Sequence, residues 1–81
     1  TLIDGITLKV ADDDLTPQFS LILNDILDKP AEQQGTLSFS IFSPRYNRKI
    51  SMRSARRIPL TRATLQALDD CDIEYEVQRR H

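Results

Sequence analysis

Two groups of aspartates, Asp12–Asp14 and the cluster around Asp69–Asp72, are the residues of this chain that could do acid–base or metal chemistry. Paired carboxylates can act as general acid and base, and closely spaced oxygens can bind a hard cation. Neither group has a histidine or lysine partner at the spacing of a catalytic site. Neither has the glycine and bidentate glutamate of a calcium loop. We expect both groups to be turn and cap residues, with no catalytic residue, metal or cofactor.

The other reactive side chains are few. The single cysteine, Cys71, follows a predicted helix C-terminus, where the helix dipole disfavours the thiolate that a nucleophile would need. The single histidine is His81, the last residue, and two glycines cannot build a phosphate-binding loop. We therefore expect no enzyme activity and no small-molecule ligand. One unpaired cysteine fits a reducing compartment and a cytoplasmic location, and no apolar run is long enough to cross a membrane.

The strongest chemical feature is a basic segment in an otherwise acidic chain. Residues 45–62 carry seven basic and no acidic side chains; residues 1–44 carry two basic and seven acidic, and residues 63–81 carry two basic and five acidic. The segment could bind an acidic protein surface or phosphates, or it could keep a hairpin soluble and protect an edge strand. The candidate contacts to a partner are Arg45, Arg48, Arg53, Arg56, Arg57 and Arg62, with Phe42 and Tyr46 as apolar anchors and Arg79 and Arg80 as a second patch.

A nucleic-acid partner has weaker support than a protein partner. A sheet that binds single-stranded RNA stacks bases on outward aromatic side chains of its central strands. On the predicted strands the outward positions are small or charged, and Phe42 is the one aromatic residue among them. Thr36, Ser38 and Ser40 instead predict a flat, polar sheet surface, either solvated or docked against another module.

Hydropathy periods predict the elements that must position these residues. Ile6, Leu8 and Val10 alternate with polar residues, as in a half-buried strand. A helix begins after the cap Thr16, carries an apolar stripe, and must end before Pro30. Apolar alternation then predicts a strand over 36–42, a turn at 43–47, a strand from 49 that runs on to an edge segment at 56–60, a helix capped by Thr61, and a last strand over 73–77.

The order β-α-β-β-α-β in 81 residues predicts one α+β domain, residues 1–81. Two helices with one apolar stripe each can cover one face of a four-stranded sheet, which gives a two-layer sandwich. The sheet could be antiparallel in the split, ferredoxin-like arrangement, or mixed and incomplete Rossmann-like. Element order alone does not decide between them.

The second half of the chain resembles the extreme C-terminal domain of the bacterial DNA polymerase III alpha subunit. The strand Ile6-Thr7-Leu8-Lys9-Val10 and the helix after it also lie where that family places them, so the resemblance extends over residues 3–78. It is carried by Gly35-Thr36-Leu37-Ser38-Phe39-Ser40-Ile41, Lys49-Ile50-Ser51-Met52-Arg53-Ser54, Arg57-Ile58-Pro59-Leu60-Thr61, Leu65-Gln66-Ala67-Leu68 and Ile73-Glu74-Tyr75-Glu76-Val77. The turn at 44–48 and the arginine-rich stretch 53–57 depart from the family pattern.

The resemblance implies a non-catalytic module at the C-terminus of a much larger polymerase chain. In that family the catalytic carboxylates lie far upstream, and the C-terminal domain docks the tau subunit of the clamp loader. We therefore expect a protein-interaction domain of the replisome, and a chain that begins at Thr1 without methionine fits a piece of a longer protein. The alternatives are a small regulatory module that binds a metabolite, or a nucleic-acid-binding module that uses residues 45–62.

Overall fold

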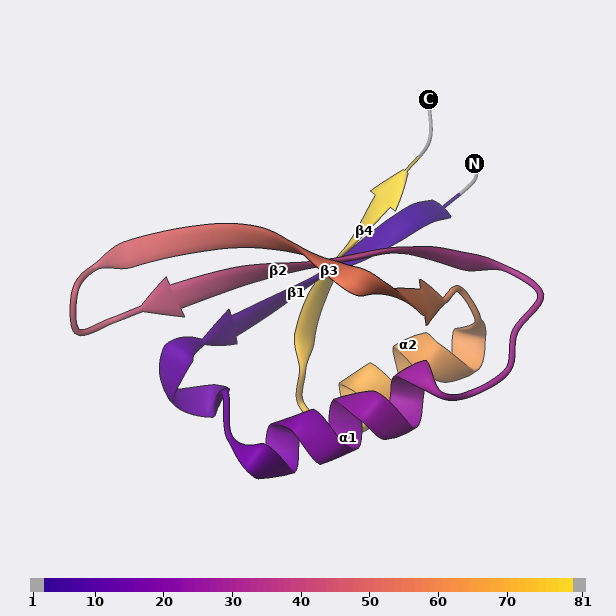
Figure 1. Cartoon of the computed structure of the whole chain (residues 1–81), viewed down its shortest axis with the longest axis horizontal. Helices are drawn as coiled ribbons and strands as arrows, with labels where there is room; N and C mark the ends of the chain where they lie inside the picture. Colours follow the sequence, from indigo (N-terminus) through magenta and orange to yellow (C-terminus); the bar gives the residue numbers. More distant parts are fainter. Residues whose placement is uncertain (1–2, 80–81) are drawn as a thin grey trace.

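The regular elements follow one another along the chain in the order that the hydropathy periods predict (Figure 1). The computed structural model describes residues 3–79. The elements are β1 (Ile3–Ala11), the short 3-10 helix η1 (Asp12–Asp14), α1 (Pro17–Leu27), β2 (Gln34–Ser43), β3 (Arg48–Pro59), α2 (Arg62–Asp70) and β4 (Glu74–Arg79).

Both helices begin at the caps expected from the sequence. The Thr16 side chain accepts a hydrogen bond from the Phe19 amide at 3.2 Å, and Pro17 occupies the first turn, where its missing N–H costs nothing. Thr61 caps α2 in the same way and accepts from the Thr64 amide at 3.1 Å. These caps fix where each helix starts relative to the strand before it.

The sheet is mixed and has the strand order β3-β2-β1-β4. β1 and β2 are parallel neighbours joined by α1, whereas β2–β3 and β1–β4 are antiparallel pairs. The first βαβ unit is therefore not split by an intervening strand. The predicted α+β sandwich is confirmed, and its sheet is mixed rather than antiparallel.

The core lies between the sheet and the two helices, which cover the same face (Figure 1). Ile6, Leu8 and Leu37 share one face of β1 and β2 because the register places Ile6 opposite Leu37. They pack against Leu23 of α1 and Leu68 of α2. The other buried members of this cluster are Ile26, Leu27, Ile58 and Ile73.

The two edges of the sheet are β3 and β4, so the basic segment forms an edge as the sequence predicts. The turn between β2 and β3 contains Asn47 at φ 50°, in the left-handed region that asparagine tolerates. Further along, Thr36 pairs with Arg57 and Ser38 with Arg53, so residues 54–56 of β3 oppose Leu37 alone. This bulge divides β3 into a regular half, residues 48–53, and a short half next to Pro59.

No helix within residues 3–79 is long and apolar enough to cross a membrane.

Candidate functional site: the β2–β3 hairpin and its basic edge

The basic residues of β3 do not form one patch, because the strand directs them to both faces of the sheet. Residues directly opposite each other across paired strands share a face. Lys49, Arg53 and Arg57 pair with Phe42, Ser38 and Thr36, which lie on the face away from the helices.

Arg56 points to the helix side and is bonded to α1. Its guanidinium donates to Asn24 Oδ1 at 3.0 Å and to Asp28 Oδ1 at 2.7 Å. Its backbone N–H donates to the Ser54 hydroxyl at 3.0 Å, inside the bulge. Arg56, predicted as a partner contact, thus has partners within its own domain, and it ties the edge strand to the helix layer.

The remaining predicted arginines lie far apart in the fold. Arg57 donates to the Gln34 carbonyl at 2.7 Å, across the β2–β3 pair. Arg62 is exposed in the first turn of α2, and Arg79 ends β4 on the opposite edge. Arg80 lies outside the described residues. Arg79, the described residue of the second predicted patch, is therefore separated from the β3 edge by the width of the sheet.

The tip of the hairpin brings together three of the predicted contacts. Arg45 lies over the Tyr46 ring, with its guanidinium carbon 5.5 Å from the ring centroid, and Arg48 begins β3 beside them. A guanidinium stacked on an aromatic face in this way is a cation–π contact. The Tyr46 side chain remains 65% exposed, so the pair presents both an apolar plane and a positive charge.

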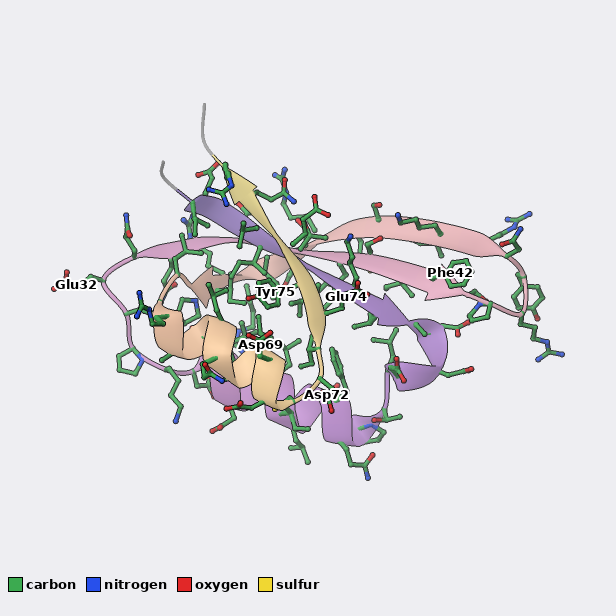
Figure 2. All side chains as sticks on the ribbon, turned by 180° about the vertical axis from the view of Figure 1, so that it is seen from behind. Glu32, Phe42, Asp69, Asp72, Glu74 and Tyr75 are labelled. Carbon is green, nitrogen blue, oxygen red and sulfur yellow. The ribbon has the colours of Figure 1, made fainter. Side chains whose placement is uncertain are left out.

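The hairpin extends beyond both helices and beyond the end of β1 (Figure 1). We call residues 39–53 the hairpin arm. A β2 of 10 residues is about 33 Å long, whereas the 11 residues of α1 span about 16 Å. The helix layer is therefore too short to cover the whole arm, and Phe39 packs against the core cluster whereas Ile50 and Met52 do not. Figure 2 shows Phe42 on this arm, where it pairs with Ala11 at the end of β1.

Apolar side chains on the arm are left exposed as a result. Ile50 and Met52 are 58% and 52% exposed, although their register partners Ile41 and Phe39 place them on the core face of the sheet. Phe42, on the other face, is 41% exposed. Ile50 and Met52 belong to this site, and they are absent from the contact residues predicted from the sequence. The sequence signal for their exposure is the difference in length between the strands of the hairpin and the shorter helix α1.

The open face of the sheet is polar, as predicted, and its charge changes sign from one edge to the other. The β3 edge is positive, and β4 contributes Glu74 and Glu76 at the far edge. Lys9 Nζ lies 3.0 Å from Glu76 Oε2. This hydrogen bond and the nearby negative charge raise the pKa of Lys9 above 10.5. Between the edges, β1 and β2 carry mainly hydroxyl groups on this face, namely those of Thr7, Thr36, Ser38 and Ser40.

An open groove of about 940 Å³ lies at the end of β1, next to the arm. It is lined by Phe19 and Ile22 of α1, by Phe42 and Lys49 of the hairpin, and by residues 71–74. Ile22 is 41% exposed here, so the first half of α1 is less buried than its apolar stripe predicts. The groove thus connects α1 with Phe42 of the arm, and charged residues such as Lys9, Asp14 and Glu74 also line it.

The aspartate groups occupy the turns expected for them. Asp12–Asp14 form η1, and Asp69 and Asp70 end α2. Within residues 3–79 there is no group of three or more histidine, cysteine, aspartate or glutamate side chains that could hold a metal ion. Cys71 is exposed and free. These aspartates and Cys71 lie outside the hairpin arm.

Comparison with known proteins gives no relative for this chain. No protein-family model, no curated protein and no solved structure matches it.

Proposed function

We propose that this chain is a protein-interaction module that binds its partner through the hairpin arm. The observation that carries the proposal is the exposure of Ile50, Met52 and Tyr46, each more than half exposed. Exposed apolar groups of this size beside charged ones are typical of protein-binding surfaces. The cations at the rim of the arm, Arg48 and Lys49, make no ion pair within residues 3–79.

The resemblance of residues 3–78 to the C-terminal domain of the DNA polymerase III alpha subunit supports a specific partner. On this proposal the chain is the terminal module of that subunit and docks the tau subunit of the clamp loader in the cytoplasm. The module contributes no catalytic group, and nucleotide addition belongs to the rest of the polymerase. The apolar residues of the arm supply the binding energy, and the rim cations orient an acidic partner surface.

Nucleic acid has less support as the partner. Two of the basic residues, Arg56 and Arg57, are bonded within the domain. The open face offers hydroxyl groups rather than a row of aromatic rings for base stacking. No feature of the fold favours a metabolite-binding role over protein binding.

Binding of purified tau to the 81-residue chain, measured by isothermal titration calorimetry, tests the proposal. The double variant Ile50→Ser with Met52→Ser removes the apolar centre of the arm. We expect it to bind at least about tenfold more weakly, because centrally placed apolar contacts dominate such interfaces. The matched control is Leu21→Ser on α1, which removes a side chain that is 71% exposed but lies outside the arm.

Wild-type affinity in the control, with weak binding in the double variant, supports the arm as the docking surface. The proposal is wrong if tau does not bind the chain, or if it binds the double variant as tightly as the wild type.

A further inference from the structure

The outer edge of β3 is a regular, uncovered strand edge over residues 48–53. All six residues are exposed, and the bulge at 54–56 ends the regular stretch. Alternate residues of an edge strand direct their N–H and C=O groups away from the neighbouring strand, where another strand can pair with them. Six residues are about 20 Å long, enough for a short strand.

The two faces of this edge differ in chemistry. Ile50 and Met52 lie on one face, and Lys49 and Arg53 lie on the other. A strand that paired here would place its side chains alternately beside the apolar pair and beside the cations, because strand side chains alternate between faces. A partner strand that fits both faces therefore alternates apolar residues, which lie beside Ile50 and Met52, with acidic residues, which lie beside Lys49 and Arg53.

The same sheet already holds a strand of this kind at its other edge. In β4, Tyr75 and Val77 lie opposite Leu8 and Ile6 on the core face, and Glu76 lies on the open face, paired with Lys9. A strand that paired with the β3 edge would therefore need the same alternation of apolar and acidic residues that β4 has where it pairs with β1.

We propose that the β3 edge over Arg48–Arg53 binds an extended segment of the partner protein, rich in alternating acidic and apolar residues, as a fifth strand of the sheet. Main-chain hydrogen bonds supply part of the affinity, and the pairing of acidic side chains with Lys49 and Arg53 selects the partner and its register. This inference rests on the proposed protein-binding function and specifies how the arm engages its partner.

The charges on the edge disfavour a second copy of the same edge as the occupant. Two β3 strands side by side would bring Arg48, Lys49 and Arg53 of both copies together, and like charges across a strand pair are destabilising. Such cations are also a common protection against indiscriminate edge pairing. The same cations attract the acidic side chains of a partner strand, so they select that partner over a second copy of the chain.

A fluorescent eight-residue peptide with three glutamates alternating with isoleucine and valine is the first probe. We measure its binding to the 81-residue chain by anisotropy, and the amide hydrogen exchange of the chain, with and without the peptide, by NMR. We expect binding to slow exchange at alternate amides within residues 48–53. The variant Lys49→Glu with Arg53→Glu should bind at least about tenfold more weakly. Lys29→Glu with Arg62→Glu makes the same change of charge at exposed sites away from the edge, and should bind as the wild type does.

A peptide with lysine in place of the glutamates should not bind measurably. Equal binding of both peptides, equal binding of both double variants, or unchanged exchange at residues 48–53 would each overturn strand addition. Concentration-dependent self-association of the chain that excludes the peptide would also overturn it.

The same exchange measurement with tau separates this inference from the proposed function. If tau binds and the serine variant of Ile50 and Met52 weakens it, but the β3 amides stay unprotected, then the arm is the docking surface and strand addition is wrong. If tau does not bind while the acidic peptide does, strand addition stands and the identity of the partner is wrong.

Discussion

Arg56 Nη2, on the edge strand, lies 2.7 Å from Asp28 Oδ1 at the end of α1. The two residues are 28 positions apart in sequence, and the contact joins the sheet layer to the helix layer outside the hydrophobic core. The bulge at 54–56 is what places Arg56 there, since three residues of β3 oppose one residue of β2. The end of β3 nearest Pro59 is thereby held to the helices, whereas within residues 3–79 no hydrogen bond or ion pair joins the hairpin arm to them.

Replacing Arg56 with methionine should destabilise the domain modestly. The arginine side chain is 46% exposed and that of Asp28 is 70% exposed, so solvent weakens the ion pair. We expect a loss of about 0.5–1 kcal/mol in the free energy of unfolding, measured by urea denaturation. Arg45→Met at the hairpin tip is the control and should change stability little. An unchanged stability for Arg56→Met would show that the contact does not hold the layers together.

Alanine at Gly35 should destabilise the domain by overpacking. A Cβ atom built at Gly35 lies 2.5 Å from the Asp4 carbonyl oxygen and 2.9 Å from a methyl carbon of Leu60. The backbone must shift to relieve the first contact, so we expect a loss of about 1–3 kcal/mol in urea denaturation. Ser51→Ala, at an exposed strand position, should cost far less. If Gly35→Ala lowers the free energy of unfolding no more than Ser51→Ala does, then β1 and β2 do not approach each other as closely as the structure shows.

Glycine at Asp72 should stabilise the domain. Asp72 has φ 56°, its amide donates to the Asp69 carbonyl, and the Ile73 amide donates to the Leu68 carbonyl at 2.9 Å. This is a Schellman motif, in which the left-handed residue is usually glycine. Relief of the left-handed strain should add about 0.5–1 kcal/mol.

Asp70→Gly, within α2, is the matched comparison for that change. Glycine inside a helix lowers stability, and the Gln66 hydrogen bond to Asp70 is also lost. Thermal melts of both variants should therefore shift in opposite directions. A fall in the melting temperature of Asp72→Gly would contradict the assigned helix end.

The ion pair between Lys9 and Glu76 should contribute stability that disappears at high pH. The hydrogen bond to Glu76 is the main cause that raises the pKa of Lys9 above its usual 10.5, and the charge of Glu76 adds to it. A group whose pKa is raised on folding stabilises the folded state in its protonated form. The contribution is therefore complete below pH 10.5 and is lost as the pH rises through the pKa of the folded state.

Urea denaturation of wild type and Lys9→Met between pH 8 and 12 measures this effect. The difference in the free energy of unfolding should be constant up to about pH 10 and shrink above it. Lys49→Met, on the same face of the sheet, is the control. A difference between wild type and Lys9→Met that does not change with pH would show that the ion pair does not form in solution.

Much of the fold follows from local chemistry that can be read without coordinates. Thr16 and Thr61 cap the helices as expected because a hydroxyl before a helix satisfies amides that have no other partner. Asn47 takes the left-handed conformation of the turn, and the alternation at Ile6, Leu8 and Val10 predicts the buried face of β1. Each of these signals acts over a few residues.

The candidate site was less accessible to that reasoning. The basic segment was visible, but whether Arg56 faces solvent or α1 depends on a bulge that the alternation of residues does not reveal. Ile50 and Met52 have the pattern of buried residues, and only the position of the helices shows that nothing covers them. Glu76 pairs with Lys9 and lies far from Arg53, because β3 and β4 occupy opposite edges of the sheet, and the strand order is not visible in the alternation of residues.

The sequence by itself determined the elements, their caps and turns, and which face of each strand is apolar, because these depend on the period of the side chains and on neighbours within about four residues. Only the tertiary structure decided the strand order, the unsplit β1–β2 pair and the exposure of the hairpin arm. Those features depend on the relative lengths of the strands and helices and on how the helix layer packs on the sheet. An apolar residue is buried only where another layer reaches it, and here the helices end before the hairpin does.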